Sequence, residues 1–270
     1  MEWYQALVLA IIQGLTEFLP VSSSGHLVLP KELLGWPDQG LAFDVAVHVG
    51  SLIAVVGYFR HTLFQMAQAW LGGVFKPASL NEEQQGLSRL AWLVVAATIP
   101  AGVLGVVFGD FIEQHLRSAV VLASTTIVYG IFLGIADKTA KGNRELVTMG
   151  LGIALAIGFA QALALVPGTS RSGITITAAL FLGLNRVDAA RFSFLLSVPL
   201  ILAAGSLKGV ELIQLGETVD WAMISLGVVA SAVTAYACIH AFLKLVDRIG
   251  MMPFVVYRLV LGALLIVLLV

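Results

Sequence analysis

Charged side chains are scarce in this chain of 270 residues: Lys, Arg, Asp and Glu together make up 11% of it. A soluble globular domain carries about 25% charged residues, so the composition excludes an ordinary soluble protein. The net charge of −1 also argues against a nucleic-acid partner, which would require a basic surface. Cys238 is the only cysteine, which excludes an intramolecular disulfide and any metal site built from several cysteines.

Hydrophobic residues make up 59% of the chain. Because a helix crosses a bilayer with about 20 apolar residues, this composition predicts an all-α polytopic membrane protein, with one integral membrane domain over residues 1–270. The N-terminus lacks the basic region of a cleaved signal peptide, so we expect the first apolar segment to remain. The apolar segments fall at about 5–19, 41–60, 90–109, 118–136, 147–166, 187–207, 221–243 and 253–270.

Two polar stretches interrupt this pattern, at 20–40 and 167–186, and they resemble each other. Each follows a glutamine in the apolar segment before it, contains proline, glycine and several hydroxyl side chains, and precedes a similar apolar helix. We interpret the chain as an internal repeat with halves at about 1–136 and 147–270. Paired interruptions in two halves of a membrane protein indicate a binding site near the middle of the membrane. Chance similarity between apolar sequences is the alternative.

Lysine and arginine concentrate in four connections, which are 60–89, 137–146, 186–191 and 244–250. Basic connections lie on the cytoplasmic side of a membrane protein. All four fall on one side only if segments 5–19 and 147–166 turn back within the membrane instead of crossing it. The charges therefore predict an inverted-topology repeat of about six transmembrane helices and two re-entrant helical hairpins, with both termini outside.

The first polar stretch concentrates groups that catalysis uses. Gln13 and Glu17 are four residues apart, so they share one face of a helix. Pro20 disfavours helix at the residue before it, and serines 22–24 and His26 follow. A serine beside an imidazole is typical of an activated nucleophile, although His26 could itself be the nucleophile or the general acid. Glu17 could act as a base or bind magnesium or calcium. Taken singly, the serines and the histidine are better explained by helix capping and an interfacial position.

The second polar stretch contains Arg171 between two serines, in a glycine-bearing turn ahead of an apolar helix. A guanidinium offers planar bidentate donors to a phosphate, and backbone N–H groups at a helix N-terminus add further donors. The pattern predicts phosphate binding, with a basic residue at the membrane boundary as the alternative. Because the first stretch supplies a carboxylate, hydroxyls and an imidazole, we expect the two stretches to meet in one site.

Other polar residues of the apolar segments are weaker candidates. Asp44 and His48 lie one helical turn apart and could support the site, but a helix cap near the interface is the preferred interpretation of Asp44. Arg258 follows Tyr257 in the last apolar segment and is expected to extend to the cytoplasmic face. Three histidines near predicted helix ends are interpreted as interfacial: His61, His115 and His240.

With these two motifs the chain resembles the undecaprenyl-diphosphate phosphatases, the bacitracin-resistance family of bacterial membrane proteins, over essentially its whole length. One family motif, (Glu/Gln)-x-x-x-Glu, is matched by Gln13 and Glu17 and runs into a Phe-Leu-Pro-Val-Ser-Ser-Ser-Gly-His segment that ends at His26. The other, Pro-Gly-x-Ser-Arg-Ser-x-x-Thr, begins at Pro167 and ends at Thr175. Other members have Glu where this chain has Gln13, so this chain carries no negative charge there.

The resemblance implies hydrolysis of the C55 polyprenyl diphosphate carrier to the monophosphate and phosphate, which recycles the carrier for peptidoglycan synthesis and gives bacitracin resistance. It implies a catalytic set of Glu17, Ser23, His26 and Arg171, and a divalent cation, magnesium or calcium, with Glu17 as ligand. It implies an inner-membrane protein whose active site faces the periplasm. Bacitracin would compete for the same lipid substrate, and the protein could form a homodimer. The substrate-binding residues expected from both motifs are Gln13, Ser22, Ser24, Ser170, Ser172 and Thr175.

A secondary transporter or lipid flippase is the main alternative, because inverted repeats with interrupted helices are typical of transporters. Such a carrier would bind a lipid phosphate without needing a nucleophile, so Ser23, His26 and Glu17 distinguish the two functions. A purely structural membrane protein is a third alternative, but it would not need polar stretches at two equivalent positions.

Overall fold

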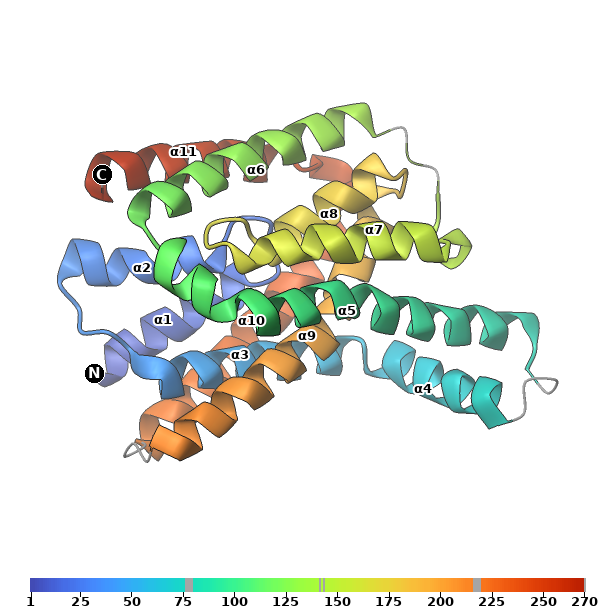
Figure 1. Ribbon diagram of the computed structural model, residues 1–270, viewed down its shortest axis with the longest axis horizontal. Coiled ribbons are helices and arrows are strands. Elements are labelled where there is room, and N and C mark those ends of the chain that lie inside the picture. Colours follow the sequence, from blue (N-terminus) through green and yellow to red (C-terminus); the bar gives the residue numbers. More distant parts are fainter. Residues whose placement is uncertain (76–79, 141, 143, 216–219, 270) are drawn as a thin grey trace.

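The computed structural model describes residues 1–75, 80–140, 142, 144–215 and 220–269, and these residues form an all-helical bundle without a strand (Figure 1). The all-α prediction is therefore confirmed. The first half contains α1 (Trp3–Thr16), α2 (Ser23–Leu34), α3 (Gly40–Tyr58), α4 (Arg60–Phe75), α5 (Glu82–His115) and α6 (Ala119–Thr139). The second half contains the 3-10 turn η2 (Leu146–Thr148), α7 (Leu151–Ala162), the turn η3 (Leu163–Leu165), α8 (Arg171–Phe181), α9 (Arg186–Leu215), α10 (Trp221–Ile249) and α11 (Met252–Leu269).

Five helices in these ranges are long and apolar enough to cross a membrane: α3, α5, α6, α9 and α10. Helices α1, α7 and α11 are apolar but shorter. Between 28% and 44% of the most apolar window of each long helix is buried in the bundle, so most of that apolar surface faces outward. Lipid suits such a surface better than water does, and the helices indicate a multi-pass membrane protein.

The connection predicted over 60–89 contains α4, and α5 begins inside it. Helix α5 starts early because Asn81 caps it. The Asn81 side chain accepts a hydrogen bond from the Gln84 backbone N–H, and the Gln84 side chain accepts one from the Asn81 N–H. The apolar segment predicted at 90–109 therefore missed both ends of this helix. Two basic positions of the predicted connections, Lys76 and Lys141, lie outside the described residues.

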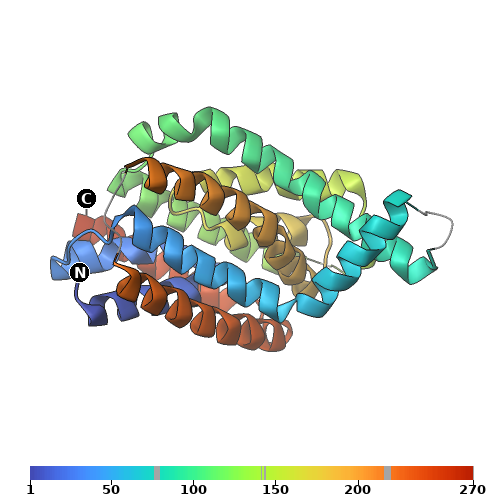
Figure 2. The ribbon, with the colours of Figure 1, turned by 90° about the horizontal axis from the view of Figure 1, so that it is seen from below.

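Helices α1 and α2 form one hairpin and α7 and α8 form another, and the two hairpins enter the bundle from opposite ends (Figure 1). Their connecting segments, residues 17–22 (the first loop) and 163–170 (the second loop), lie inside the bundle. Helix α1 packs against α10 and α7 packs against α5, so each hairpin contacts a long helix of the other half. Both chain termini lie at the same end of the bundle (Figures 1 and 2).

The last residue of each loop has the same unusual backbone conformation. Ser22 and Ser170 have φ values of 74° and 68°, in the left-handed region that non-glycine residues rarely adopt. Each serine caps the helix that follows, because its Oγ accepts a hydrogen bond from the backbone N–H of Gly25 or Gly173. The two loops thus share a local geometry. Backbone strain of this kind persists only where the surroundings hold it, and it clusters at functional sites.

Candidate active site

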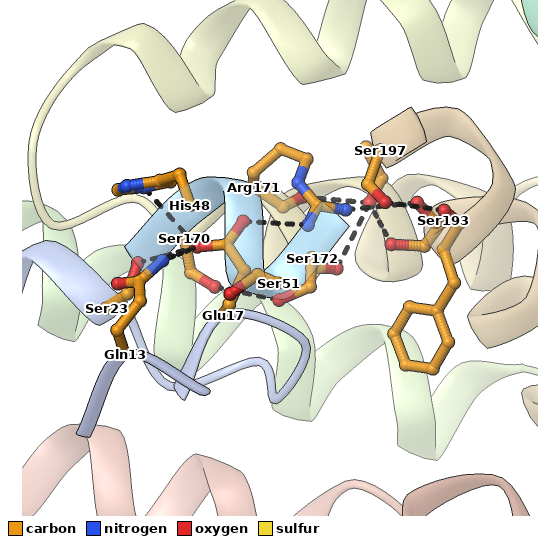
Figure 3. A network of polar contacts seen from close by, with 12 residues as sticks. Gln13, Glu17, Ser23, His48, Ser51, Ser170, Arg171, Ser172, Ser193 and Ser197 are labelled. Carbon is orange, nitrogen blue, oxygen red and sulfur yellow. Dashed lines mark hydrogen bonds and ion pairs between the residues drawn. The ribbon is translucent and has the colours of Figure 1, made fainter. Parts of the chain in front are cut away.

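Glu17 follows α1 with its carboxylate directed into the bundle (Figure 3). The next residue, Phe18, is fully buried and packs edge-on against Phe194 of α9, with ring centroids 5.2 Å apart. That contact anchors the first loop and holds the neighbouring carboxylate in place. The Glu17 side chain is only 8% exposed, so it requires partners that offset its lost hydration.

Three side chains provide those partners (Figure 3). Arg171 Nη2 lies 3.0 Å from Glu17 Oε1 and forms an ion pair between the two hairpins. Gln13 Nε2 donates to Glu17 Oε2 at 2.9 Å from one helical turn away, as the spacing of four residues predicts. The Ser23 hydroxyl donates to the same oxygen at 3.2 Å. The two polar stretches therefore meet, as expected, in a cluster of Gln13, Glu17, Ser23 and Arg171, called the polar cluster below.

Arg171 is held in a fixed orientation at the start of α8. Its Nη1 donates to the backbone carbonyl of Ser193 on α9 at 3.0 Å. Its guanidinium lies over the Phe18 ring, 5.7 Å from the ring centroid. Because the side chain is 10% exposed and bonded at both ends of its fork, its planar donors are oriented before any ligand arrives.

Other hydroxyls of the two motifs bond the hairpins to each other. Ser24 Oγ accepts a hydrogen bond from the Gly168 N–H at 3.2 Å, and Ser172 Oγ donates to the Leu19 carbonyl at 2.8 Å. Four predicted substrate-binding residues are fully buried: Gln13, Ser22, Ser172 and Thr175. These groups shape the loops around the polar cluster, and their contact with a substrate stays a prediction.

His26 lies apart from the polar cluster. Its Nδ1 is 2.7 Å from the Ser22 carbonyl oxygen, and its Nε2 is 2.6 Å from the Tyr257 hydroxyl of α11. Since a carbonyl only accepts, Nδ1 carries the proton, and in the neutral ring Nε2 accepts from the tyrosine. Within the described residues His26 makes no hydrogen bond to Ser23 or Glu17. The serine–imidazole pairing considered from the sequence is therefore not formed in this structure.

Arg258 is fully buried, so the expectation that it extends to the membrane surface is wrong. Its guanidinium donates to the backbone carbonyls of Pro20 in the first loop and Gly168 in the second, at 3.4 and 3.0 Å. It also donates to the carbonyls of Thr125 and Thr126 on α6, at 3.4 and 3.1 Å. Loop carbonyls inside an apolar bundle need donors, and this side chain supplies them to both loops at once.

Two cavities adjoin the polar cluster. One, of about 620 Å³, is lined by Glu17 and Arg171, and the other, of about 770 Å³, is lined by Ser23. Asp44 and His48 of α3 line both cavities. His48 Nε2 lies 3.9 Å from Glu17 Oε2, so this imidazole faces the site more directly than His26 does.

Asp44 does not cap α3, contrary to the preferred interpretation from sequence. The helix begins at Gly40 after Gln39, and the Asp44 carboxylate accepts a hydrogen bond from the Gln39 side chain at 3.0 Å. Sequence reasoning also missed Arg117, which lines both cavities, and Lys208, which lines the smaller one. No motif spacing marks these two cations, because only the fold brings them beside the polar cluster.

The polar cluster also offers oxygen ligands to a divalent cation. The Gln13 amide adjoins the Glu17 carboxylate, and its Oε1 is buried without a hydrogen-bond partner in the described structure. Magnesium and calcium prefer such oxygens, and magnesium sites commonly include substrate phosphates. The described residues contain no group of three or more His, Cys, Asp or Glu side chains arranged to hold a metal ion. The residues therefore fit a cation that shares its coordination with a bound phosphate.

Residues 6–264 match the family of the bacitracin resistance protein BacA, and this range includes the whole polar cluster. The chain is 57% identical over 265 residues to the undecaprenyl-diphosphatase of Teredinibacter turnerae, with 98% of each chain covered. It is 58% identical over 265 residues to the protein of the same name from Alcanivorax borkumensis, with 97% of each chain covered. Identity is 55% over 263 residues to that of Saccharophagus degradans, again with 97% of each covered.

Proposed function

This chain belongs to the family of the bacitracin resistance protein BacA, and we propose that it is an undecaprenyl-diphosphatase. It hydrolyses the C55 polyprenyl diphosphate carrier to the monophosphate and inorganic phosphate. The observation that carries this proposal is the contact of Glu17 with both Ser23 and Arg171 inside an apolar bundle. Together these residues supply a hydroxyl, a proton acceptor and a phosphate-binding cation.

The substrate has a charged head and a long apolar tail. Its diphosphate fits the polar cluster, where the preoriented Arg171 fork can bind phosphoryl oxygens in two places. The smaller cavity continues from Glu17 and Arg171 to apolar side chains of α5 and α9, including Ala101 and Leu200, which suit the start of the tail. Arg117 lines both cavities and adds a second positive charge for the diphosphate.

Ser23 is the nucleophile that the geometry supports best. Its Oγ forms a bond to the terminal phosphorus and passes its proton to Glu17 Oε2, while the bridging P–O bond breaks and releases the polyprenyl monophosphate. Water then attacks the phosphoserine, the Ser23 O–P bond breaks, and phosphate leaves with the serine hydroxyl restored. Arg171 stabilises the charge on the phosphoryl oxygens during both displacements.

His26 acts in this scheme as a positioning residue, because its ring holds the Ser22 carbonyl next to the nucleophile. Attack by His26 itself, or by water, is the alternative that the Ser23 variant below distinguishes. A divalent cation, magnesium or calcium, is the expected cofactor, with Glu17 and Gln13 Oε1 as ligands. When bound, it would neutralise charge on the phosphoryl oxygens.

Six helices cross the membrane in this proposal, namely α3, α5, α6, α9, α10 and α11, and the two hairpins are re-entrant. The shared end of both termini supports this topology. At the other end, Asp137 bonds Arg186 and the Met251 backbone, which brings the ends of α6, α9 and α11 together beside basic connections. The positive-inside rule makes this basic end cytoplasmic, so the protein lies in the inner membrane with the termini and the active site on the periplasmic side.

In the cell, this reaction would return the lipid carrier to peptidoglycan synthesis. It would also give bacitracin resistance, because bacitracin competes for the same lipid diphosphate. Association into a homodimer is a further proposal, tested by the mass of the purified protein in detergent. A flippase would need the same phosphate-binding arginine but not a hydroxyl bonded to a carboxylate, so the Ser23–Glu17 contact favours the phosphatase.

Phosphate release from C55 polyprenyl diphosphate by the protein purified in detergent tests the proposed function. We expect turnover with magnesium or calcium present and loss of turnover when a chelator is added, with recovery on adding the cation back. A purified, folded protein that binds the lipid diphosphate but releases no phosphate under any of these conditions would favour the flippase.

A further inference from the structure

A third cavity, of about 590 Å³, lies at the end of the bundle away from the chain termini (Figure 1). It forms where α3 meets α4, between the start of α9 and the end of α10, and we call it the basal cavity. It shares no lining residue with the two cavities beside the polar cluster. Its polar lining residues are Tyr58, Thr62, Arg191, His240 and Lys244.

The charge of the basal cavity is positive. Lys244 lies one helical turn after His240 on α10 and has no acidic partner among the residues that the structure describes. Arg191 reaches Asp188 only at 3.5 Å. That carboxylate already accepts hydrogen bonds from the Leu146 N–H and the Asn185 amide, each at 3.0 Å. Two cations and an imidazole therefore line the cavity, and its described lining includes no aspartate or glutamate.

The rest of the cavity lining is apolar. It consists of Phe59, Leu90, Leu146, Leu195 and Leu243. On two of the helices that line the cavity, large apolar side chains are exposed at the surface: Phe64 of α4 is 63% exposed and Leu245 of α10 is 44% exposed. A ligand for this place must combine an anionic group with apolar chains.

We propose that the basal cavity binds the phosphate group of an anionic phospholipid, whose acyl chains lie against the outward apolar faces of α4 and α10. Basic pockets between transmembrane helices bind such head groups, and each Lys or Arg near the head group strengthens binding. The guanidinium of Arg191 and the ammonium of Lys244 hold the phosphate, and the hydroxyls of Tyr58 and Thr62 are available to its other oxygens. This site is independent of the proposed hydrolysis at Glu17 and Arg171.

Native mass spectrometry of the purified protein tests the site with phosphatidylglycerol and phosphatidylcholine of the same acyl chains. We expect one phosphatidylglycerol to bind at least about fivefold more tightly than phosphatidylcholine. Lys244→Gln and Arg191→Gln should each weaken phosphatidylglycerol binding by about fivefold, whereas Lys244→Arg retains it. Arg248→Gln is the matched control, because Arg248 is an exposed cation on the same helix that does not line the cavity.

Thermal unfolding of each variant shows whether it is folded, and Arg191→Gln still tests the proposal if Lys244→Gln does not fold. Equal binding of both lipids, or equal losses in Arg248→Gln and Lys244→Gln, would overturn the proposal. Competition with inorganic phosphate tests whether the ligand is a lipid or free phosphate. If it displaces phosphatidylglycerol at millimolar concentration and depends on Lys244 in the same way, the cavity binds free phosphate and the assignment to a lipid is wrong.

Discussion

Arg171 Nη2 and Glu17 Oε1 lie 3.0 Å apart, although 154 residues separate them in the chain. The contact joins the start of α8 to the end of α1, and so joins the two hairpins. A buried ion pair of this kind contributes little to stability unless its other hydrogen bonds are made, and here Gln13, Ser23 and the Ser193 carbonyl make them. In the proposed function, this arrangement serves as a preoriented site for phosphate.

Arg171→Lys should lower phosphate release on the order of 100-fold, although the positive charge is kept. The three donors of a lysine lie on one nitrogen, so it cannot bond Glu17 and the Ser193 carbonyl with a planar fork or present that fork to a phosphoryl group. Steady-state kinetics with the lipid diphosphate measures this loss. Arg248→Lys, at an exposed position of α10, is the control and should retain activity. Comparable activity in both variants would show that only the charge of Arg171 matters.

Arg258→Met should lower both stability and activity. It leaves the Pro20 carbonyl buried without its donor and leaves the Gly168 carbonyl with only the Thr126 hydroxyl at 3.3 Å. Each buried group left unsatisfied costs about 1–3 kcal/mol. We therefore expect the midpoint of thermal unfolding in detergent to fall by about 5 °C or more. Arg258→Lys, which supplies fewer donors, should be intermediate in both measurements. A stable, fully active Arg258→Met protein would show that the loops hold their geometry without this side chain.

Tyr257→Phe separates two roles of His26. If the imidazole only positions the first loop through the Ser22 carbonyl, loss of the tyrosine hydroxyl at Nε2 should reduce kcat by about tenfold or less and leave the pH profile unchanged. His26→Ala should cost more, because it removes the contact with Ser22 as well. A pH profile that shifts in Tyr257→Phe would instead assign proton transfer to His26.

The topology is tested by a reporter fused after Val270. The two termini lie at one end of the bundle and the basic connections at the other (Figure 1). A reporter that is active only outside the cytoplasm should therefore be active in this fusion. A reporter inserted after Gly250, in the turn between α10 and α11, should show the opposite preference. A cytoplasmic signal from the Val270 fusion would contradict the proposed orientation.

Local spacing predicted the parts of the site that depend on neighbours in sequence. Gln13 and Glu17 share a helical face, as their spacing of four requires, and the two motifs with matched positions do meet. Arg258 could not be interpreted correctly, because its carbonyl partners come from both loops and α6. The position of His48 beside Glu17 depends likewise on how α3 packs, which no spacing within α3 reveals.

Helix α4 was not predicted from the sequence either, because it also depends on packing. Its 16 residues follow α3 directly, and their mixture of polar and apolar side chains does not read as a membrane span. Packing against α5 stabilises α4. Helix α5 reaches α4 because it begins early, at the Asn81 cap. Hydropathy located the five long helices but not their ends, because most of their surface faces outward and must be apolar whatever the packing inside.

The most direct test of a shared catalytic site is phosphate release by Ser23→Ala, Glu17→Gln and the double variant. Ser23 donates to Glu17, and both residues act in one step. Each single change should therefore lower the rate of phosphate release on the order of 100-fold. The double variant should be only a little slower than the slower of the two single variants. Near-full activity in Ser23→Ala, with activity lost in Glu17→Gln, would contradict attack by serine. Losses that multiply in the double variant would contradict the joint action of the two residues.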